Sequence, residues 1–255
     1  MTRAVILSAG QGRRLLPLTA TMPKCLLSVH QRPLLEWQLD ALARCGIPHA
    51  TVVTGFASEP VERLLAARTA APGTQFLYNP FFRVSDNLAS CWIARGEMTG
   101  DFVLLNGDTL FEPAVLERLL AAPPRPVRLA VDRKEAYDAD DMKVSLDADG
   151  RLRRVGKRLA PEIVGAESIG LMLFRGEGPA LFREAIEHAL RRPDALHAWY
   201  LSVIDAMADH GHVWTESIQG LKWAEIDSPA DIARALGVVE SAVDQPLGST
   251  IARTS

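Results

Sequence analysis

The sequence contains few cysteines and no long apolar segment. Its three cysteines, Cys25, Cys45 and Cys91, are an odd number without metal-site spacing, which argues against a disulfide framework or a zinc site. No stretch approaches the roughly 20 apolar residues that cross a bilayer, and the apolar run after Arg3 is too short for a secretion signal. We therefore expect a cytoplasmic protein with reduced thiols and no membrane partner. Cys25 stands beside Lys24, but without a base partner a buried apolar role is favoured over a nucleophile.

Acidic residues are missing from positions 1–35, where five cations stand: Arg3, Arg13, Arg14, Lys24 and Arg32. The chain as a whole carries a formal net charge of −3, so it lacks the basic excess that binding to nucleic acid or an anionic membrane requires. The cationic amino-terminal end is suited instead to a small anionic ligand such as a nucleoside triphosphate.

Two common phosphate-binding motifs are also absent. Leu15 stands where a dinucleotide motif needs its third glycine, and no acid follows at the required distance. A Walker loop is excluded because no glycine precedes a Lys-Ser or Lys-Thr pair. A phosphate site in this chain must therefore have another form.

A glycine-containing loop follows a short apolar run at residues 4–7 that we interpret as a buried strand. Gly10 and Gly12 let the backbone turn tightly and approach a ligand, and Arg14 and Lys24 supply cationic donors. Such a loop is typical of phosphate binding, although two glycines alone are equally compatible with a surface turn.

The alternation of short apolar strands with helical patterns predicts an α/β fold. Strands are expected at 4–7, 50–54, 75–78 and 102–106, separated by helices at 33–43, 59–67 and 87–94, with another helix after Pro113. This pattern predicts a mostly parallel central sheet in a Rossmann-like three-layer arrangement. We expect a single domain over residues 1–240, with residues 1–125 as its nucleotide-binding half and a flexible tail at 241–255.

The second half is expected to form a smaller, β-rich acceptor-binding lobe over residues 126–240. Strands are predicted at 127–131, 143–146, 151–156, 168–174, 213–216 and 223–226, with helices at 179–191, 199–210 and from Ser228 to about residue 239.

Two distant acids are candidate metal ligands. Asp108 follows the predicted strand at 102–106, and Glu225 and Asp227 are expected on one face of the strand at 223–226. Carboxylate oxygens at such positions can hold Mg²⁺ together with substrate phosphates. The alternatives are a turn residue for Asp108 and a helix cap for Asp227.

The pattern G-x-G-x-R-x-x-P-x-T over residues 10–19, followed by Pro23-Lys24, resembles the signature of nucleotidyltransferases that join an NTP to a phosphorylated small molecule. The segments 79–90, 141–144, 156–157 and 165–170 are similar to the phosphocholine-cytidylyltransferase-like subgroup of this sugar-nucleotidyltransferase superfamily. The sequence departs from that subgroup at Asp86, where those enzymes often have Asn.

The resemblance implies transfer of a nucleotide from CTP to a small phosphorylated or phosphonate amine, with release of pyrophosphate and with Mg²⁺ as the cofactor. It implies catalytic roles for Arg14, Lys24 and Lys157, with metal binding by Asp108, Asp227 and Glu225. The implied nucleotide-binding residues are Leu7, Ala9, Gly10, Gly12, Arg13, Asn79, Asn87, Ser90 and Gly107. It is also compatible with a homodimer, a state in which related enzymes often occur.

The residues that bind the acceptor are less constrained. Aromatic faces and carboxylates suit a cationic head group. The candidates are Asp141, Lys157, Glu167, Tyr137, Trp199 and Tyr200. Each aromatic ring is alternatively a core residue, and the acids at 138–141 are alternatively a solvated loop. Two other functions stay open: a sugar-1-phosphate nucleotidyltransferase, and a homologue that binds nucleotide without turnover.

Overall fold

The computed structural model describes residues 1–243, and four parallel strands organise its first half. Their bounds are β1 (Arg3–Leu7), β4 (His49–Thr54), β5 (Gly73–Tyr78) and β6 (Phe102–Asn106). β1 lies between β4 and β6, so that Val5 pairs with Thr51 on one side and Leu104 on the other. The carboxyl ends of β1, β4 and β6 therefore meet at one edge, which is where ligands bind in open α/β sheets.

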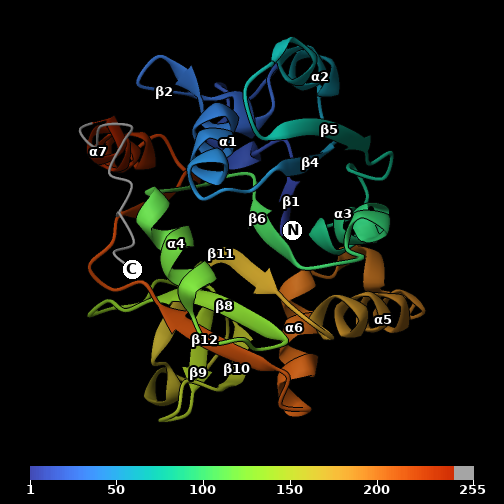
Figure 1. The fold of residues 1–255 in the computed structure, drawn as a ribbon, viewed down its shortest axis with the longest axis vertical. Helices are drawn as coiled ribbons and strands as arrows, with labels where there is room; N and C mark the ends of the chain where they lie inside the picture. Colours follow the sequence, from blue (N-terminus) through green and yellow to red (C-terminus); the bar gives the residue numbers. More distant parts are fainter. Residues whose placement is uncertain (244–255) are drawn as a thin grey trace, which may run out of the picture.

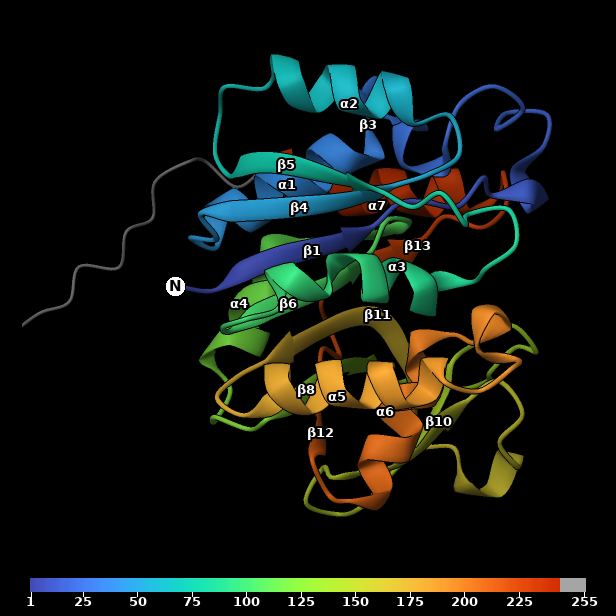
Figure 2. The same cartoon turned by 90° about the vertical axis from the view of Figure 1, so that its right-hand side faces the viewer.

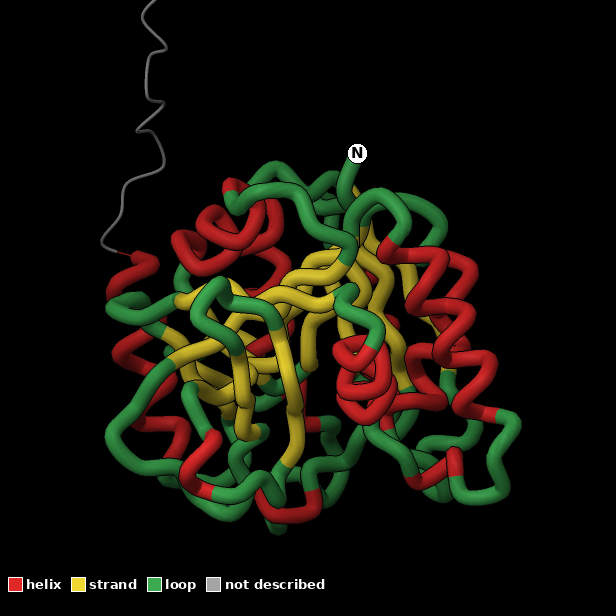
Figure 3. Tube along the Cα trace, turned by 90° about the horizontal axis from the view of Figure 1, so that it is seen from below, coloured by secondary structure: helices red, strands yellow, loops and turns green. Residues whose placement is uncertain are grey.

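Helices cover both faces of this sheet, as Figures 1 and 2 show. Because side chains alternate along a strand, Val5 and Leu7 join the core on one face and Ala4 and Ile6 join the core on the other. The first face is covered by α3 (Asn87–Ile93), α5 (Gly178–Leu190) and α6 (Tyr200–Asp209). The second is covered by α1 (Leu34–Arg44), α2 (Ser58–Ala67) and α4 (Pro113–Ala121). The tube view shows the strands enclosed between these helices (Figure 3).

The second half extends the same sheet with mainly antiparallel pairs. Its strands are β8 (Val127–Asp132), β9 (Lys143–Leu146), β10 (Leu152–Gly156), β11 (Ala166–Phe174) and β12 (Val213–Ser217). β11 pairs antiparallel with β6, which joins both halves in a nine-stranded sheet. β11 also pairs with β8 and β9, and β12 pairs in parallel with β8. The predicted α/β fold is thus confirmed. The strands β5, β4, β1 and β6 are parallel, and the strands added by the second half pair in a mixed, mainly antiparallel way.

Two pairs of short strands lie at the sheet edge, and of these four strands only the one at 223–225 was predicted. β7 (Thr109–Phe111) pairs with β13 (Trp223–Glu225), and β2 (Ser28–Val29) pairs with β3 (Arg32–Pro33). Helix α7 (Asp231–Val243) packs on β13, β7 and β2 and encloses a third apolar cluster that includes Leu15 and Ile226. As a result, the segment containing Asp227 lies beside the loop that follows β1.

The remaining differences from the predicted elements are small shifts at their ends. The strand predicted over 223–226 ends at Glu225, so Asp227 lies in the turn after β13 rather than on a strand face. The last helix continues to Val243. Residues 241–243 of the predicted flexible tail therefore belong to α7, and its remaining residues, 244–255, lie outside the described residues. No helix within residues 1–243 has the length and apolar composition needed to cross a membrane.

Candidate active site

The loop after β1 is held in place by backbone and side-chain hydrogen bonds. Gly12 has a left-handed conformation with φ 73°, and a Cβ atom there would lie 3.1 Å from Cβ and Cδ of Lys24. Both observations favour glycine at this position. Thr19, which is fully buried, donates its hydroxyl hydrogen to the Gly12 carbonyl at 2.8 Å. Leu15, standing where a dinucleotide motif would have its third glycine, is buried in the cluster beneath α7.

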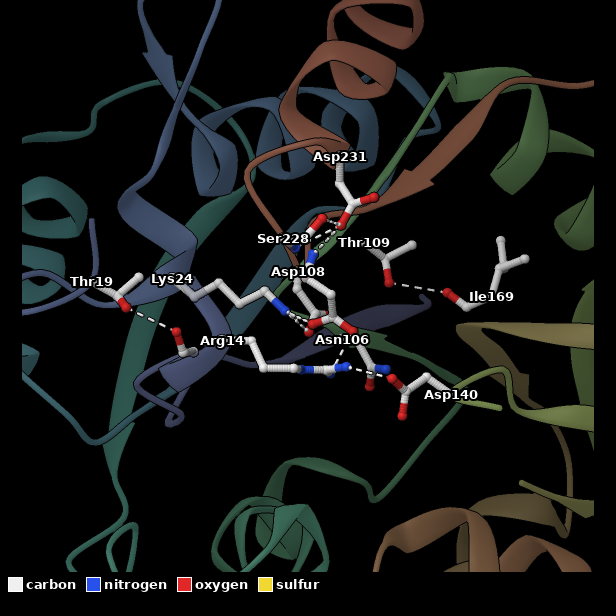
Figure 4. A network of polar contacts seen from close by, with 12 residues as sticks. Arg14, Thr19, Lys24, Asn106, Asp108, Thr109, Asp140, Ile169, Ser228 and Asp231 are labelled. Carbon is white, nitrogen blue, oxygen red and sulfur yellow. Dashed lines mark hydrogen bonds and ion pairs between the residues drawn. The ribbon is translucent and has the colours of Figure 1, made fainter. Parts of the chain in front are cut away.

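Lys24 connects the two predicted metal ligands. Its ammonium donates to Oδ2 of Asp108 at 2.8 Å (Figure 4). It also donates to Oδ1 of Asp227. Burial disfavours the charged ammonium, but the carboxylates of Asp108 and Asp227 outweigh that effect and raise the pKa of Lys24 above its ordinary value. Lys24 is therefore charged at neutral pH. The turn that carries Asp227 is fixed by Asp231, whose Oδ2 accepts the backbone N–H groups of Asp227 and Ser228 at 3.0 and 2.6 Å.

Glu225 completes a group of three acids that could hold a metal ion. One carboxylate oxygen each from Asp108, Glu225 and Asp227 lies within 4.8 Å of the others. Oδ1 of Asp108 is buried and has no hydrogen-bond partner among the described residues. Buried polar atoms normally have a partner, so this oxygen is suited to bind a ligand from outside the protein. Desolvation of the carboxyl group and then the charges of Asp108 and Asp227 raise the pKa of Glu225 to about 8, although the residue is exposed overall. Three crowded carboxylates with an unpaired buried oxygen fit a divalent cation bound through oxygen.

Asp140 joins two further cations that lie on separate parts of the chain. Its carboxylate is 3.2 Å from Nη1 of Arg14, in the loop after β1, and 3.3 Å from Nζ of Lys157, which follows β10. Arg14 also pairs with Asp227 at 2.6 Å, and Lys157 lies 4.8 Å from the centroid of the Trp199 ring. The predicted catalytic cations Arg14, Lys24 and Lys157 are thus brought together by acids. Asp140, which connects two of them, belongs to the acidic run 138–141 and was considered as a carboxylate for the acceptor, but its contacts with Arg14 and Lys157 were not predicted.

A cavity of about 390 Å³ lies between this charged cluster and α3. All nine predicted nucleotide-binding residues line it: Leu7, Ala9, Gly10, Gly12, Arg13, Asn79, Asn87, Ser90 and Gly107. The lining also includes residues that were not predicted: Ser8, Cys25, Phe82, Ser85, Asp86 and Asn106. Gly107 is required here because a Cβ would collide with the Ser8 side chain. Cys25 is fully buried, and burial raises its pKa to about 12, as its expected apolar role requires.

Three of the predicted acceptor residues meet around Lys134, which was not predicted. The Lys134 ammonium lies 2.7 Å from Asp141 and 3.0 Å from Glu167, and 5.8 Å from the centroid of the Tyr137 ring. Burial, partly offset by Lys134, raises the pKa of Glu167 to about 7. The two carboxylates and the ring thus form a cation-binding cluster outside the main cavity.

The other two predicted aromatic residues lie in different surroundings. Trp199 is partly exposed and lines the cavity. Tyr200 is fully buried, and its hydroxyl donates to Oδ1 of Asn106 at 3.1 Å, so its ring does not lie where an acceptor could touch it. Its backbone N–H donates to Oδ1 of Asn87 at 2.9 Å. Tyr200 therefore supports the cavity wall instead of contacting a ligand.

Solved structures share this architecture. The structure of CTP:phosphocholine cytidylyltransferase from Streptococcus pneumoniae superimposes with a TM-score of 0.73 at 20% identity, covering 93% of this chain and 99% of that one. This likeness defines the fold as that of an α/β nucleotidyltransferase. More specifically, the chain belongs to the family described as MobA-like NTP transferase domain, which matches residues 4–207.

Two curated relatives are similar over most of the chain. One is a CMP-5'-(3-aminopropyl)phosphonate synthase from Streptomyces rubellomurinus, 34% identical over 91% of this chain. This chain spans only 38% of that relative's length. The other is a 2-aminoethylphosphonate cytidylyltransferase from Lancefieldella rimae, 26% identical, with 91% of each chain covered.

Proposed function

We propose that this chain is a Mg²⁺-dependent cytidylyltransferase that couples CTP to a small phosphate or phosphonate bearing an amine. The observation that carries the proposal is the position of Lys24 between Asp108 and Asp227, facing the glycine loop within one cavity. The names of the two curated relatives, which describe aminoalkylphosphonate chemistry, support the choice of nucleotide and acceptor.

In the proposed reaction, an oxygen of the acceptor phosphonate forms a bond to the α-phosphorus of CTP. The bond from that phosphorus to the bridging oxygen breaks, and pyrophosphate leaves with its electron pair. No general base is needed, because a phosphomonoester loses its second proton with a pKa of about 6 and is mainly a dianion at neutral pH. Catalysis then depends on alignment of the two anions and on neutralisation of their charge.

Each of the three cations of the site is assigned a separate role in charge neutralisation. Lys24 is assigned to the α-phosphate, since it is the least exposed of the three cations and lies at the acidic cluster. Arg14 would bind the triphosphate, and Lys157 the acceptor phosphonate. Because Asp140 pairs with both Arg14 and Lys157, incoming phosphates would replace its carboxylate at these two cations. Asp108, Asp227 and Glu225 would hold Mg²⁺, which supplies additional positive charge at the phosphate oxygens when bound.

The amine of the acceptor is assigned to Asp141 and Glu167. β11 pairs antiparallel with β6, and Leu171 lies opposite Leu105. Glu167, four residues before Leu171, therefore lies beyond the carboxyl end of β6, toward the ligand edge of the sheet. Asp141 is adjacent to Asp140, which contacts Arg14. An ammonium group at the end of a short alkyl chain would find there the carboxylates that now hold Lys134.

The decisive experiment measures pyrophosphate release from each of the four NTPs with a panel of acceptors. The panel comprises 2-aminoethylphosphonate, 3-aminopropylphosphonate, phosphocholine and glucose 1-phosphate, assayed with Mg²⁺ and with a chelator. We expect release with CTP, an amine-bearing acceptor and Mg²⁺. Turnover confined to glucose 1-phosphate would instead identify a sugar-1-phosphate enzyme. Binding of CTP without release from any acceptor would identify a non-catalytic nucleotide-binding homologue.

A further inference from the structure

The cavity is chemically different at its two ends. One end carries Lys24, Arg14 and the carboxylates of Asp108 and Asp227, whereas the end beside α3 is lined by Ser85, Asp86, Asn87 and Ser90. The phosphates of a nucleoside triphosphate require the cations, so its base lies at the end beside α3. The inference that follows rests on the proposed function for its nucleotide, and it deepens that proposal by addressing how the base is selected.

Asn87 presents a hydrogen-bond donor to the cavity. Its Oδ1 accepts the backbone N–H of Tyr200 at 2.9 Å, and because a backbone N–H can only donate, the orientation of the Asn87 amide is fixed. Its Nδ2 group has no hydrogen-bond partner among the described residues. The donor hydrogens of Asn87 are consequently available to a ligand, and Asn87 lines the cavity.

Asp86 presents an acceptor that the protein does not use. It occupies the residue position before α3, yet its side chain makes no capping hydrogen bond. Within residues 1–243, no ion pair or hydrogen bond engages its carboxylate, although Asp at this position normally bonds the first N–H groups of the helix. Asn79, by contrast, is committed to the local turn, since its Nδ2 donates to Ser90 and its Oδ1 accepts from Phe81. Asp86 is thus the ionisable group left free at the base end.

Asp86 and Asn87 are neighbours in the lining of the main cavity. On a pyrimidine ring, the substituent at C4 points directly away from the ribose, because ring positions 1 and 4 are opposite, and ring nitrogen N3 lies next to it. An acceptor and a donor on neighbouring residues therefore match the 4-amino group and N3 of cytosine.

We infer that Asp86 is a base-specificity residue that accepts a hydrogen bond from the 4-amino group of cytosine, while Asn87 donates to the ring nitrogen beside it. Uracil carries a carbonyl oxygen at C4, which meets the Asp86 carboxylate as acceptor against acceptor. The acceptor at Asp86 and the donor at Asn87 thus select cytosine over uracil.

The experiment is a cycle of two proteins and two nucleotides, measured as dissociation constants with Mg²⁺ and without an acceptor. The proteins are the wild type and Asp86→Asn, and the nucleotides are CTP and a CTP analogue that lacks the 4-amino group. A hydrogen bond to a charged group changes affinity by roughly 10- to 100-fold. We expect the wild type to lose about that factor with the analogue, and Asp86→Asn to lose about threefold or less.

UTP provides the complementary measurement. The wild type is expected to bind CTP at least about tenfold more tightly than UTP, and Asp86→Asn to bring the two affinities close together, because an amide can donate or accept. Asp209→Asn makes the same charge change at an exposed residue at the end of α6 and is expected to leave the CTP-to-UTP ratio unchanged. Melting temperatures of both variants confirm that they are folded.

The outcomes separate this inference from the proposed function. The role of Asp86 is overturned, and the proposed function is not, if Asp86→Asn leaves the ratio of CTP to UTP affinity unchanged. Equal affinities of the wild type for CTP and UTP would have the same consequence. Binding of no nucleotide overturns both. The expected ratios without pyrophosphate release from any acceptor would support the role of Asp86 while removing the proposed catalytic activity.

Discussion

Lys24 and Asp108 are joined by an ion pair of 2.8 Å although 84 positions separate them in the sequence. Lys24 follows the glycine loop after β1, and Asp108 follows β6, the neighbouring parallel strand. The pair therefore connects the carboxyl ends of two adjacent strands, with Asp227 as a second partner of Lys24. This relationship unites the phosphate loop and the acidic cluster in one site.

Replacement of Lys24 by alanine is expected to abolish turnover while leaving the fold intact. The change removes the buried cation assigned to the α-phosphate, and removal of one preorganised charge of this kind typically costs a factor of 10² to 10³ in rate. The measurement is the rate of pyrophosphate release with CTP and 3-aminopropylphosphonate, together with a circular dichroism melt. Lys222→Ala, at an exposed lysine outside the cavity, serves as the matched control and should retain activity. Near-normal rates in Lys24→Ala would remove this residue from the mechanism.

Replacement of Asp108 by asparagine tests the metal assignment separately. The substitution keeps the size of the side chain but removes its charge, so we expect a rate loss of the order of 10²-fold or more and a higher Mg²⁺ concentration for half-maximal rate. A Mg²⁺ titration of pyrophosphate release measures both effects. Asp209→Asn is the control for the charge change. If Asp108→Asn keeps the wild-type Mg²⁺ dependence, Asp108 is not a metal ligand.

Gly12 offers a test of the loop conformation. Alanine at this position would hold an L side chain at φ 73° and place its Cβ 3.1 Å from the Lys24 side chain. We expect Gly12→Ala to lower the free energy of unfolding by about 1 to 2 kcal/mol and to reduce turnover through displacement of Lys24. Urea unfolding and the pyrophosphate assay measure the two effects. Gly96→Ala is a matched control, because Gly96 has nothing within 4 Å of an added Cβ and no positive φ. Equal stability of the two variants would show that the loop does not need glycine here.

The order of strands and helices was predictable because it depends on local patterns. Short apolar runs located β1, β4 and β6, and residues at the carboxyl ends of β1 and β6 line the cavity. The signature pattern also singled out Arg14 and Lys24, and the structure places both beside the acidic cluster. These features follow from spacing along the chain.

The contacts of Asp140 and Lys134 were not predictable from spacing. Asp140 is 126 positions from Arg14, and their pairing depends on how the loop before β9 packs over the sheet edge. Likewise, β7 and β13 are three-residue strands whose pairing is stabilised by α7 packing rather than by a strong local pattern. Tyr200 appeared to be a candidate ligand because a sequence does not show whether an aromatic ring is buried.

Glu167 provides a prediction of pH dependence. Its pKa is raised by burial to about 7 from an ordinary value of 4.5, so between these pH values the folded protein binds more protons at this residue than the unfolded chain does. The contribution of Glu167 to the free energy of unfolding therefore falls as the pH rises from about 4.5 to about 7. Glu167→Gln removes this titration. Its stability relative to the wild type is expected to increase over this window and to stay constant above it.

Urea unfolding at pH 5, 6, 7 and 8 measures this difference, and Glu184→Gln, at an exposed position on α5, is the control. The amine site can be tested in the same variant. Both 3-aminopropylphosphonate and propylphosphonate ionise at the phosphonate. The ratio of their KM values therefore isolates the contribution of the amine to binding. Because an ammonium binds best to ionised Glu167, the wild-type preference for the amine should grow as the pH rises through about 7, and Glu167→Gln should lack this growth. A ratio that is independent of pH in the wild type would place the amine elsewhere.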